Sequence, residues 1–112
     1  IMATIAAQAM TRTGLEETYS SAAGGGDDFI NYGNQFLHIK NGSAGDITVT
    51  IVTPGTVDGL AISNRAVIVS AGEDRFIGPF PPAYYNDSSG KVALTYSGVT
   101  SLSLAVITHG AL

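Results

Sequence analysis

Hydrophobic and polar residues alternate with a period of two in several short runs of this chain. In residues 46–53, every second position from Ile47 to Ile51 carries a branched aliphatic side chain, and threonines fill the positions between them. The same alternation recurs in residues 91–97 and 101–108. This period is typical of β-strands that bury one face. We therefore predict strands over these three runs, with the last two paired antiparallel.

A fourth predicted strand covers residues 35–40, where His38 shares one face with Phe36 and Lys40 and aliphatic side chains occupy the other face. The next five residues, 41–45, read Asn-Gly-Ser-Ala-Gly and indicate a turn. Two strands joined by a loop of this length are typical of a β-hairpin. We therefore predict that residues 35–40 and the strand after the turn pair with each other.

Two further strands are predicted over residues 65–70 and 75–78, on either side of a turn at residues 71–74. Three prolines follow within residues 79–82. Proline interrupts helices and cannot donate to a strand ladder, so this segment is predicted to be extended and rigid. We expect Phe80, within it, to plug the end of the β domain.

These short strands, with turns at intervals of about ten residues, predict an all-β fold. We expect a single antiparallel β-sandwich or jelly-roll-like barrel of about six to eight strands over residues 34–112. Residues 1–33 are rich in Ala, Ser, Thr and Gly. They predict an extended N-terminal arm, with one strand near Thr4–Met10 and a flexible loop at residues 20–28.

The composition narrows the range of partners. Charged residues make up 12% of the chain, about half the usual share, so the surface is largely neutral and poorly protected against association. The net charge is −4 and the five Lys and Arg residues are scattered, whereas binding of nucleic acid needs clustered cations. No apolar run approaches the roughly 20 residues that span a membrane. We predict neither nucleic acid nor a membrane as a partner, and no signal peptide, with Met2 read as the native start.

Candidate chemistry is sparse. The absence of cysteine excludes disulfides and thiolate sites, and no motif of a hydrolase or a phosphate-binding loop is present. His38 has no acidic residue near it in sequence, so we predict a strand side chain at a sheet edge or rim; His109 is expected to be exposed. We predict no catalytic, cofactor-binding or metal-binding residue, and therefore no enzyme.

Five aspartates are predicted to lie in loops, where a carboxylate accepts hydrogen bonds from nearby backbone amides. A calcium site built from them is the alternative, because calcium takes several converging oxygen ligands, although the ligand spacing of known calcium loops is missing. The five are Asp27, Asp28, Asp58, Asp74 and Asp87.

The arm is the feature that most indicates a partner. Ile5, Met10, Leu15 and Tyr19 make it too apolar for a free tail, and the glycines at 24–26 loosen its link to the rest of the chain. We predict that the arm packs on a neighbouring subunit, because an extended segment can add to an exposed sheet edge. The alternative is that the arm covers an edge strand of its own domain.

Two tyrosines directly after the prolines form a second candidate contact. Exposed aromatic side chains beside a rigid segment can anchor a partner, so Tyr84 and Tyr85 are candidate partner-binding residues. The alternative, equally favoured, is that one of them helps Phe80 to close the end of the domain.

A series of short motifs runs from Phe36 to Val106. The most distinctive is residues 78–82 (GPFPP); the others are residues 36–42 (FLHIKNG), 47–54 (ITVTIVTP), 57–62 (VDGLAI), 85–86 (YN) and 92–102 (VALTYSGVTSL). In these motifs the chain resembles a family of small proteins encoded among the head genes of tailed bacteriophages.

The resemblance implies a non-enzymatic virion protein, either a capsid decoration or a head-completion component, that is assembled in the host cytoplasm and needs no cofactor. We expect it to form a homo-oligomeric closed ring, with a trimer as the first expectation, and to dock on phage capsid or connector proteins. Many weak contacts repeated by symmetry would supply the avidity.

The competing hypothesis is a carbohydrate- or surface-binding β-sandwich module. Tyr84, Tyr85 and the loop acids would then form a shallow sugar site. Sugar platforms commonly stack on broad aromatic rings, and the chain has no tryptophan, so this hypothesis ranks second. An enzyme ranks last, because no nucleophile, base or metal set can be named.

Overall fold

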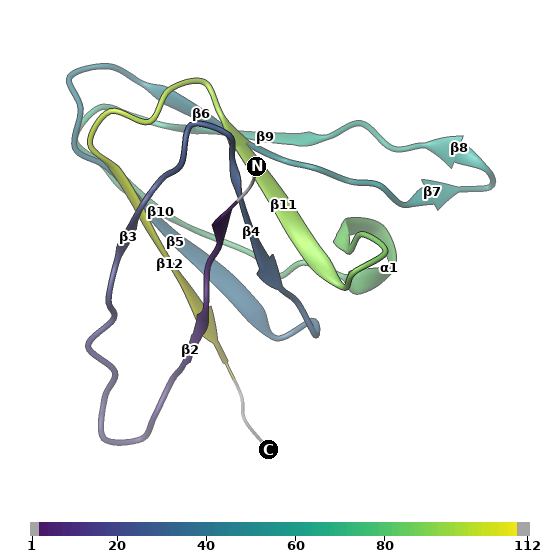
Figure 1. The fold of residues 1–112 in the computed structure, drawn as a ribbon, viewed down its shortest axis with the longest axis horizontal. Helices are drawn as coiled ribbons and strands as arrows, with labels where there is room; N and C mark the ends of the chain where they lie inside the picture. The colour runs from purple at the N-terminus through teal and green to yellow at the C-terminus, as the bar shows by residue number, and fades with distance from the viewer. Residues whose placement is uncertain (1–2, 110–112) are drawn as a thin grey trace.

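The computed structural model describes residues 3–109, which form two packed β-sheets and a hairpin that projects from one end (Figure 1). The all-β prediction is confirmed. Sheet A has the order β1 (Ala3–Thr4), β4 (Asp27–Ile30), β11 (Lys91–Tyr96), β6 (Ile47–Ile51), β9 (Arg65–Val69). Sheet B has the order β10 (Asp74–Ile77), β5 (Gln35–Asn41), β12 (Leu102–Thr108), β2 (Ala7–Ala9), with β3 (Ser20–Ser21) also paired to β12. The projecting hairpin consists of β7 (Thr56–Val57) and β8 (Leu60–Ala61).

The predicted alternation fixes which face of each strand points into the core. The aliphatic residues Ile47–Ile51 at odd positions are buried, and the threonines between them are only half-buried. Phe29 and Phe80 meet edge to face in the interior, with ring centroids 5.6 Å apart, so Phe80 does fill the core as predicted. Burial of these side chains is the main stabilising contribution to the sandwich.

Both predicted antiparallel pairings of consecutive strands are wrong. β5 and β6 lie in different sheets, and so do β11 and β12. For β5 and β6 the reason lies at the end of β5, where the buried Asn41 side chain donates to the carbonyls of Gly45 (2.8 Å) and Val69 (3.0 Å) and accepts from the Ser43 amide (2.9 Å). These bonds direct the chain across to the opposite sheet, so the turn closes a crossover between sheets instead of a hairpin.

The N-terminal arm supplies strands to both sheets. β1 pairs parallel with β4, β2 pairs parallel with β12, and β3 pairs antiparallel with β12. The Ile5 side chain is buried in the core, and its amide donates to Asp28 O at 2.8 Å. The loop predicted at residues 20–28 instead contains β3 and the first half of β4, because Asp27 is buried there and accepts a hydrogen bond from the Tyr96 hydroxyl (2.6 Å).

The proline segment differs from its prediction only at its last residue: residues 79–81 form no helix, and Pro81 has extended backbone angles. A single helical turn, α1 (Pro82–Tyr85), begins at the last of the three prolines. Proline is tolerated in the first turn of a helix, where its missing amide would have no intrahelical partner. The buried Asn31 fixes the approach to this turn by donating to Phe80 O (2.8 Å) and Asn86 Oδ1 (2.7 Å). Within residues 3–109, α1 is the only helix and no helix could cross a membrane.

Gly55, between β6 and β7, packs closely against α1. Its amide donates to Tyr84 O at 3.1 Å, and a Cβ at this position would lie 2.6 Å from Ala83 O. We expect Gly55→Ala to reduce the free energy of unfolding by about 1–3 kcal/mol, the usual cost of forcing extra volume into a packed site. Urea unfolding followed by circular dichroism measures this.

The matched control for that substitution is Gly98→Ala. Gly98 has no atom within 4 Å of the position its Cβ would take. The control should have the same urea midpoint of unfolding as wild type. An equal loss of unfolding free energy in both variants would contradict the close packing of Gly55 against α1.

Candidate functional site

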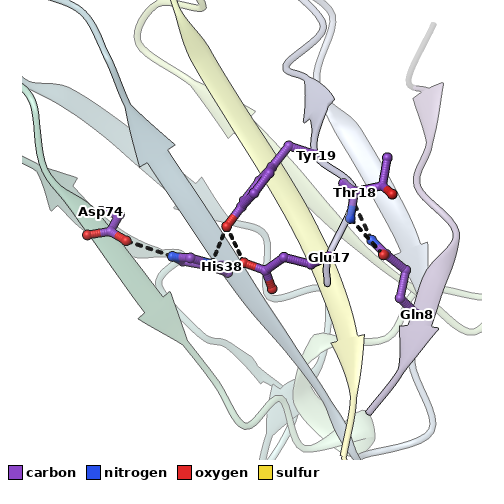
Figure 2. A network of polar contacts seen from close by, with 6 residues as sticks. All are labelled: Gln8, Glu17, Thr18, Tyr19, His38 and Asp74. Carbon is purple, nitrogen blue, oxygen red and sulfur yellow. Dashed lines mark hydrogen bonds and ion pairs between the residues drawn. The ribbon is translucent and has the colours of Figure 1, made fainter. Parts of the chain in front are cut away.

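A polar cluster surrounds His38 on the outer face of sheet B (Figure 2). His38 Nε2 lies 2.7 Å from Asp74 Oδ2 on β10. On the other side of the ring, His38 Nδ1 contacts the Glu17 carboxylate and lies 3.0 Å from the Tyr19 hydroxyl. The Tyr19 hydroxyl also donates to Glu17. The arm thus meets sheet B through a histidine held between two carboxylates.

Aromatic rings enclose this cluster. The Phe76 ring stacks on His38, with centroids 4.1 Å apart, and the Tyr19 ring meets it edge-on at 5.5 Å. Lys40 Nζ lies 4.6 Å from the centre of the Tyr19 ring. As a result, His38 is only 7% exposed. It is a strand side chain, as predicted, but it is buried on the interior strand β5 and does not lie at an edge or rim. Its partners are 21 and 36 positions away in sequence, where no local pattern indicates them.

The environment shifts three ionisable groups. The hydrogen bond from His38 is the largest effect on Asp74 and lowers the pKa of that carboxyl. Burial works to raise the pKa of Glu17, but hydrogen bonds from Tyr19 and His38 and the nearby positive charges outweigh it, so the pKa of Glu17 is lowered. Burial and the bond to Glu17 raise the pKa of Tyr19 to about 12.

The cluster is built to hold the arm in place. Both ring nitrogens of His38 contact carboxylates, so this one side chain joins Glu17 of the arm to Asp74 of β10. No group of three or more His, Asp or Glu side chains that could hold a metal ion occurs in the described part of the chain. A pair of hydrogen bonds within the arm lies beside the cluster: Gln8 Nε2 donates to Thr18 O (2.8 Å), and the Thr18 amide donates to Gln8 Oε1 (2.9 Å).

The five aspartates predicted to lie in loops belong to several elements, and for three of them the loop prediction is wrong, because they lie in strands. Asp27 and Asp28 belong to β4 and Asp74 begins β10. Asp87 follows the predicted turn chemistry, since its Oδ1 accepts from the amides of Ser89 (2.8 Å) and Lys91 (3.1 Å). Asp58 is in the turn of the projecting hairpin.

The four apolar arm residues do not form one surface. Ile5 is buried and Tyr19 covers His38, both within the same chain. Leu15 is half-buried and Met10 is exposed. The single chain therefore has the arrangement in which the arm covers edges of its own domain. Exchange of the arm between copies would use the same contacts and stays a prediction.

The two tyrosines after the prolines differ from each other. The Tyr85 ring packs edge-on against Phe80 at 5.6 Å, and its hydroxyl accepts a hydrogen bond from Arg65 Nε at 3.1 Å. Tyr84 is exposed. One tyrosine thus closes the core and one remains available to a partner.

Exposed large hydrophobic side chains that the sequence reasoning did not single out are spread over several elements. Leu60 (70% exposed) and Val57 (54%) lie on the projecting hairpin, Ile68 (59%) lies on β9, and Phe76 (68%) lies on β10. Phe76 also borders an open groove of about 540 Å³ whose other walls include Phe36 and Pro79. The outward positions of predicted strands were a signal that could have found Phe76 and Ile68.

Comparisons with protein-family models, with curated proteins and with solved structures found no match for this chain.

The His38 cluster predicts a stability contribution that depends on pH. A carboxyl whose pKa is lowered by folding stabilises the folded state above its unfolded pKa, about 4.3 for glutamate, and loses that contribution as the pH falls through the folded value. We expect Glu17→Gln to reduce the free energy of unfolding by about 0.2–1 kcal/mol near pH 5.5. The difference from wild type should shrink as the pH falls below about 4.

Urea unfolding between about pH 5.5 and pH 3 checks this expectation. Glu16→Gln is the matched control, since Glu16 is the exposed neighbour and no hydrogen bond of its side chain is recorded among the described residues. The stabilising role of the Glu17 carboxylate would be contradicted if the difference in unfolding free energy between wild type and Glu17→Gln stayed unchanged at pH 3. It would also be contradicted if Glu16→Gln lost as much stability.

Proposed function

We propose that this chain is a non-enzymatic structural protein of a tailed-phage virion, a capsid decoration or head-completion component that self-associates and docks on the capsid lattice. The observation that carries the proposal is the β7–β8 hairpin, which projects from the sandwich into solvent and exposes Val57 and Leu60 (Figure 1). The resemblance of residues 36–106 to phage head proteins supports the same proposal.

The hairpin has the physical character of a docking element. A two-stranded hairpin is at best marginally stable by itself, and each of its strands has only two residues. Fully burying a Val or Leu side chain is worth about 1.5–3 kcal/mol, so contact with a partner would stabilise the hairpin as well as bind it. On a symmetric lattice the same contact recurs in every copy, and modest affinities add up to avidity.

The low charge of the surface supports association over much of the molecule. With 12% charged residues, few charges oppose the approach of a second neutral surface. The exposed Phe76 lies on β10 in sheet B, whereas the hairpin connects β6 and β9 of sheet A, so one copy could contact more than one neighbour.

The proposal is tested by measuring self-association of the whole chain and its binding to capsid particles assembled from the major capsid protein of the same virus. Light scattering coupled to size exclusion should show oligomers, and co-sedimentation should show binding. We expect Leu60→Ser to weaken capsid binding about 10- to 100-fold, which corresponds to loss of one buried aliphatic side chain.

Thr56→Ser, on the same hairpin and also exposed, is the matched control and should bind as wild type does. Thermal unfolding midpoints equal to wild type would show that both variants are folded. A chain that is monomeric at about 1 mM and does not bind capsids would overturn the proposal.

A further inference from the structure

The edges of the two sheets are unequally protected. On one side of the strand orders, the arm strands cover β4 and β12. On the other side, β9 ends sheet A and β10 ends sheet B. Free edges invite pairing with another chain unless charges, prolines or short length prevent it.

β10 has such protection and β9 has little. β10 carries the charged residues Asp74 and Arg75. The Arg75 guanidinium donates a hydrogen bond to the backbone carbonyl of Asp74 (2.8 Å). β9 reads Arg-Ala-Val-Ile-Val, with its only charge at the first position. Within residues 3–109, β9 is thus the longest sheet edge without a charge or proline in its interior.

The hydrogen bonds of β6 show which groups of β9 are free. Thr48 O accepts from the Ser97 amide (2.9 Å), and the Val52 amide donates to Ala93 O (3.0 Å). Even-numbered residues of this strand therefore direct their backbone groups toward β11. In an antiparallel sheet the backbone groups of successive residues point to opposite sides, so odd-numbered residues of β6 direct theirs toward β9.

The odd-numbered residues of β6 lie opposite Arg65, Val67 and Val69. It follows that the amides and carbonyls of Ala66 and Ile68 point away from sheet A. Two donors and two acceptors are thereby presented along one edge, and the Ile68 side chain beside them is 59% exposed.

We infer that β9 pairs antiparallel with β9 of a second copy, about a two-fold axis through Val67. This inference deepens the proposed self-association and rests on it. Ala66 would exchange two hydrogen bonds with Ile68 of the partner subunit, and the axis would generate the same two bonds again. The free groups are therefore complementary to themselves, as an interface with two-fold symmetry requires.

The charges around β9 favour the same orientation. The strand begins at Arg65 and ends beside acids: Asp46 Oδ1 accepts from the Ala71 amide (3.0 Å), and Glu73 follows in the turn. Antiparallel pairing places the cationic end of each β9 against the acidic end of the other, whereas parallel pairing would place like charges together. The charges around β9 are therefore complementary to those of a second copy in the antiparallel orientation.

Disulfide trapping tests the register, and the absence of native cysteine makes it specific. In the inferred dimer Val67 faces Val67 of the partner subunit as a pair without mutual hydrogen bonds, whose Cα atoms lie about 4.5 Å apart. Mild oxidation should convert most of Val67→Cys to a cross-linked dimer. Ile68→Cys is the control: it is more exposed, but its Cα would lie about 7–8 Å from its own counterpart, beyond easy disulfide reach.

A second pair of variants tests the edge without cysteine. Ile68→Lys places a charge on the free edge and should raise the dissociation constant of the dimer at least about tenfold. Thr95→Lys, an exposed position on the interior strand β11, adds the same charge to sheet A and should leave the dimer unchanged. Thermal unfolding at low concentration reports whether each variant is folded.

The outcomes separate this inference from the proposed function. If wild type self-associates but Val67→Cys does not cross-link and Ile68→Lys does not shift the dissociation constant, the β9 pairing is overturned and the virion proposal stands. Cross-linking of Ile68→Cys as efficient as that of Val67→Cys would also overturn the register. A wild-type chain that stays monomeric at about 1 mM would overturn the β9 pairing, and one that also fails to bind capsids would overturn the virion proposal.

Discussion

Backbone amides and carbonyls at the lateral edges of two sheets must be paired, hydrated or protected. The path of the N-terminal arm and the position of the free edge both follow from this constraint. The N-terminal arm runs along β4 with one strand and along β12 with two. The arm thereby covers the edges of β4 and β12 on one side of the sandwich, although its sequence lacks a clear strand pattern. The opposite side keeps a free apolar edge at β9. The molecule is closed on one side and open on the other, and the inferred contact between copies lies on the open side.

The His38 cluster explains why such a short-stranded arm stays in place. Strands of two or three residues contribute few ladder bonds, so side chains must add to them. Glu17 and Tyr19 supply those contacts from the arm, and Asp74 completes the environment of the histidine from β10. Charge-assisted hydrogen bonds are stronger than neutral ones, and stacking of Phe76 on His38 helps to bury the ring that both carboxylates contact.

The strands of the sandwich could be predicted from the sequence, but their partners could not. The alternation in Ile47–Ile51 identifies a strand and its inward face, because burial of one face has a period of two. Nothing in that period states which strand lies beside it. The turn after β5 has the residues of a hairpin loop, yet the Asn41 side chain bonds to Val69 of the other sheet and directs a crossover. His38 was missed as a cluster for the same reason, since its acids come from elements far away in sequence.

The parallel pairing of β2 with β12 joins Ala7 to Val106, about a hundred positions apart. Contacts of such high sequence separation form late and slowly during folding. During synthesis β2 leaves the ribosome well before β12, so it has no partner in its own chain until β12 has been translated. During that interval β2 is open to pairing with β12 of another copy, and an exchanged arm would arise by this route.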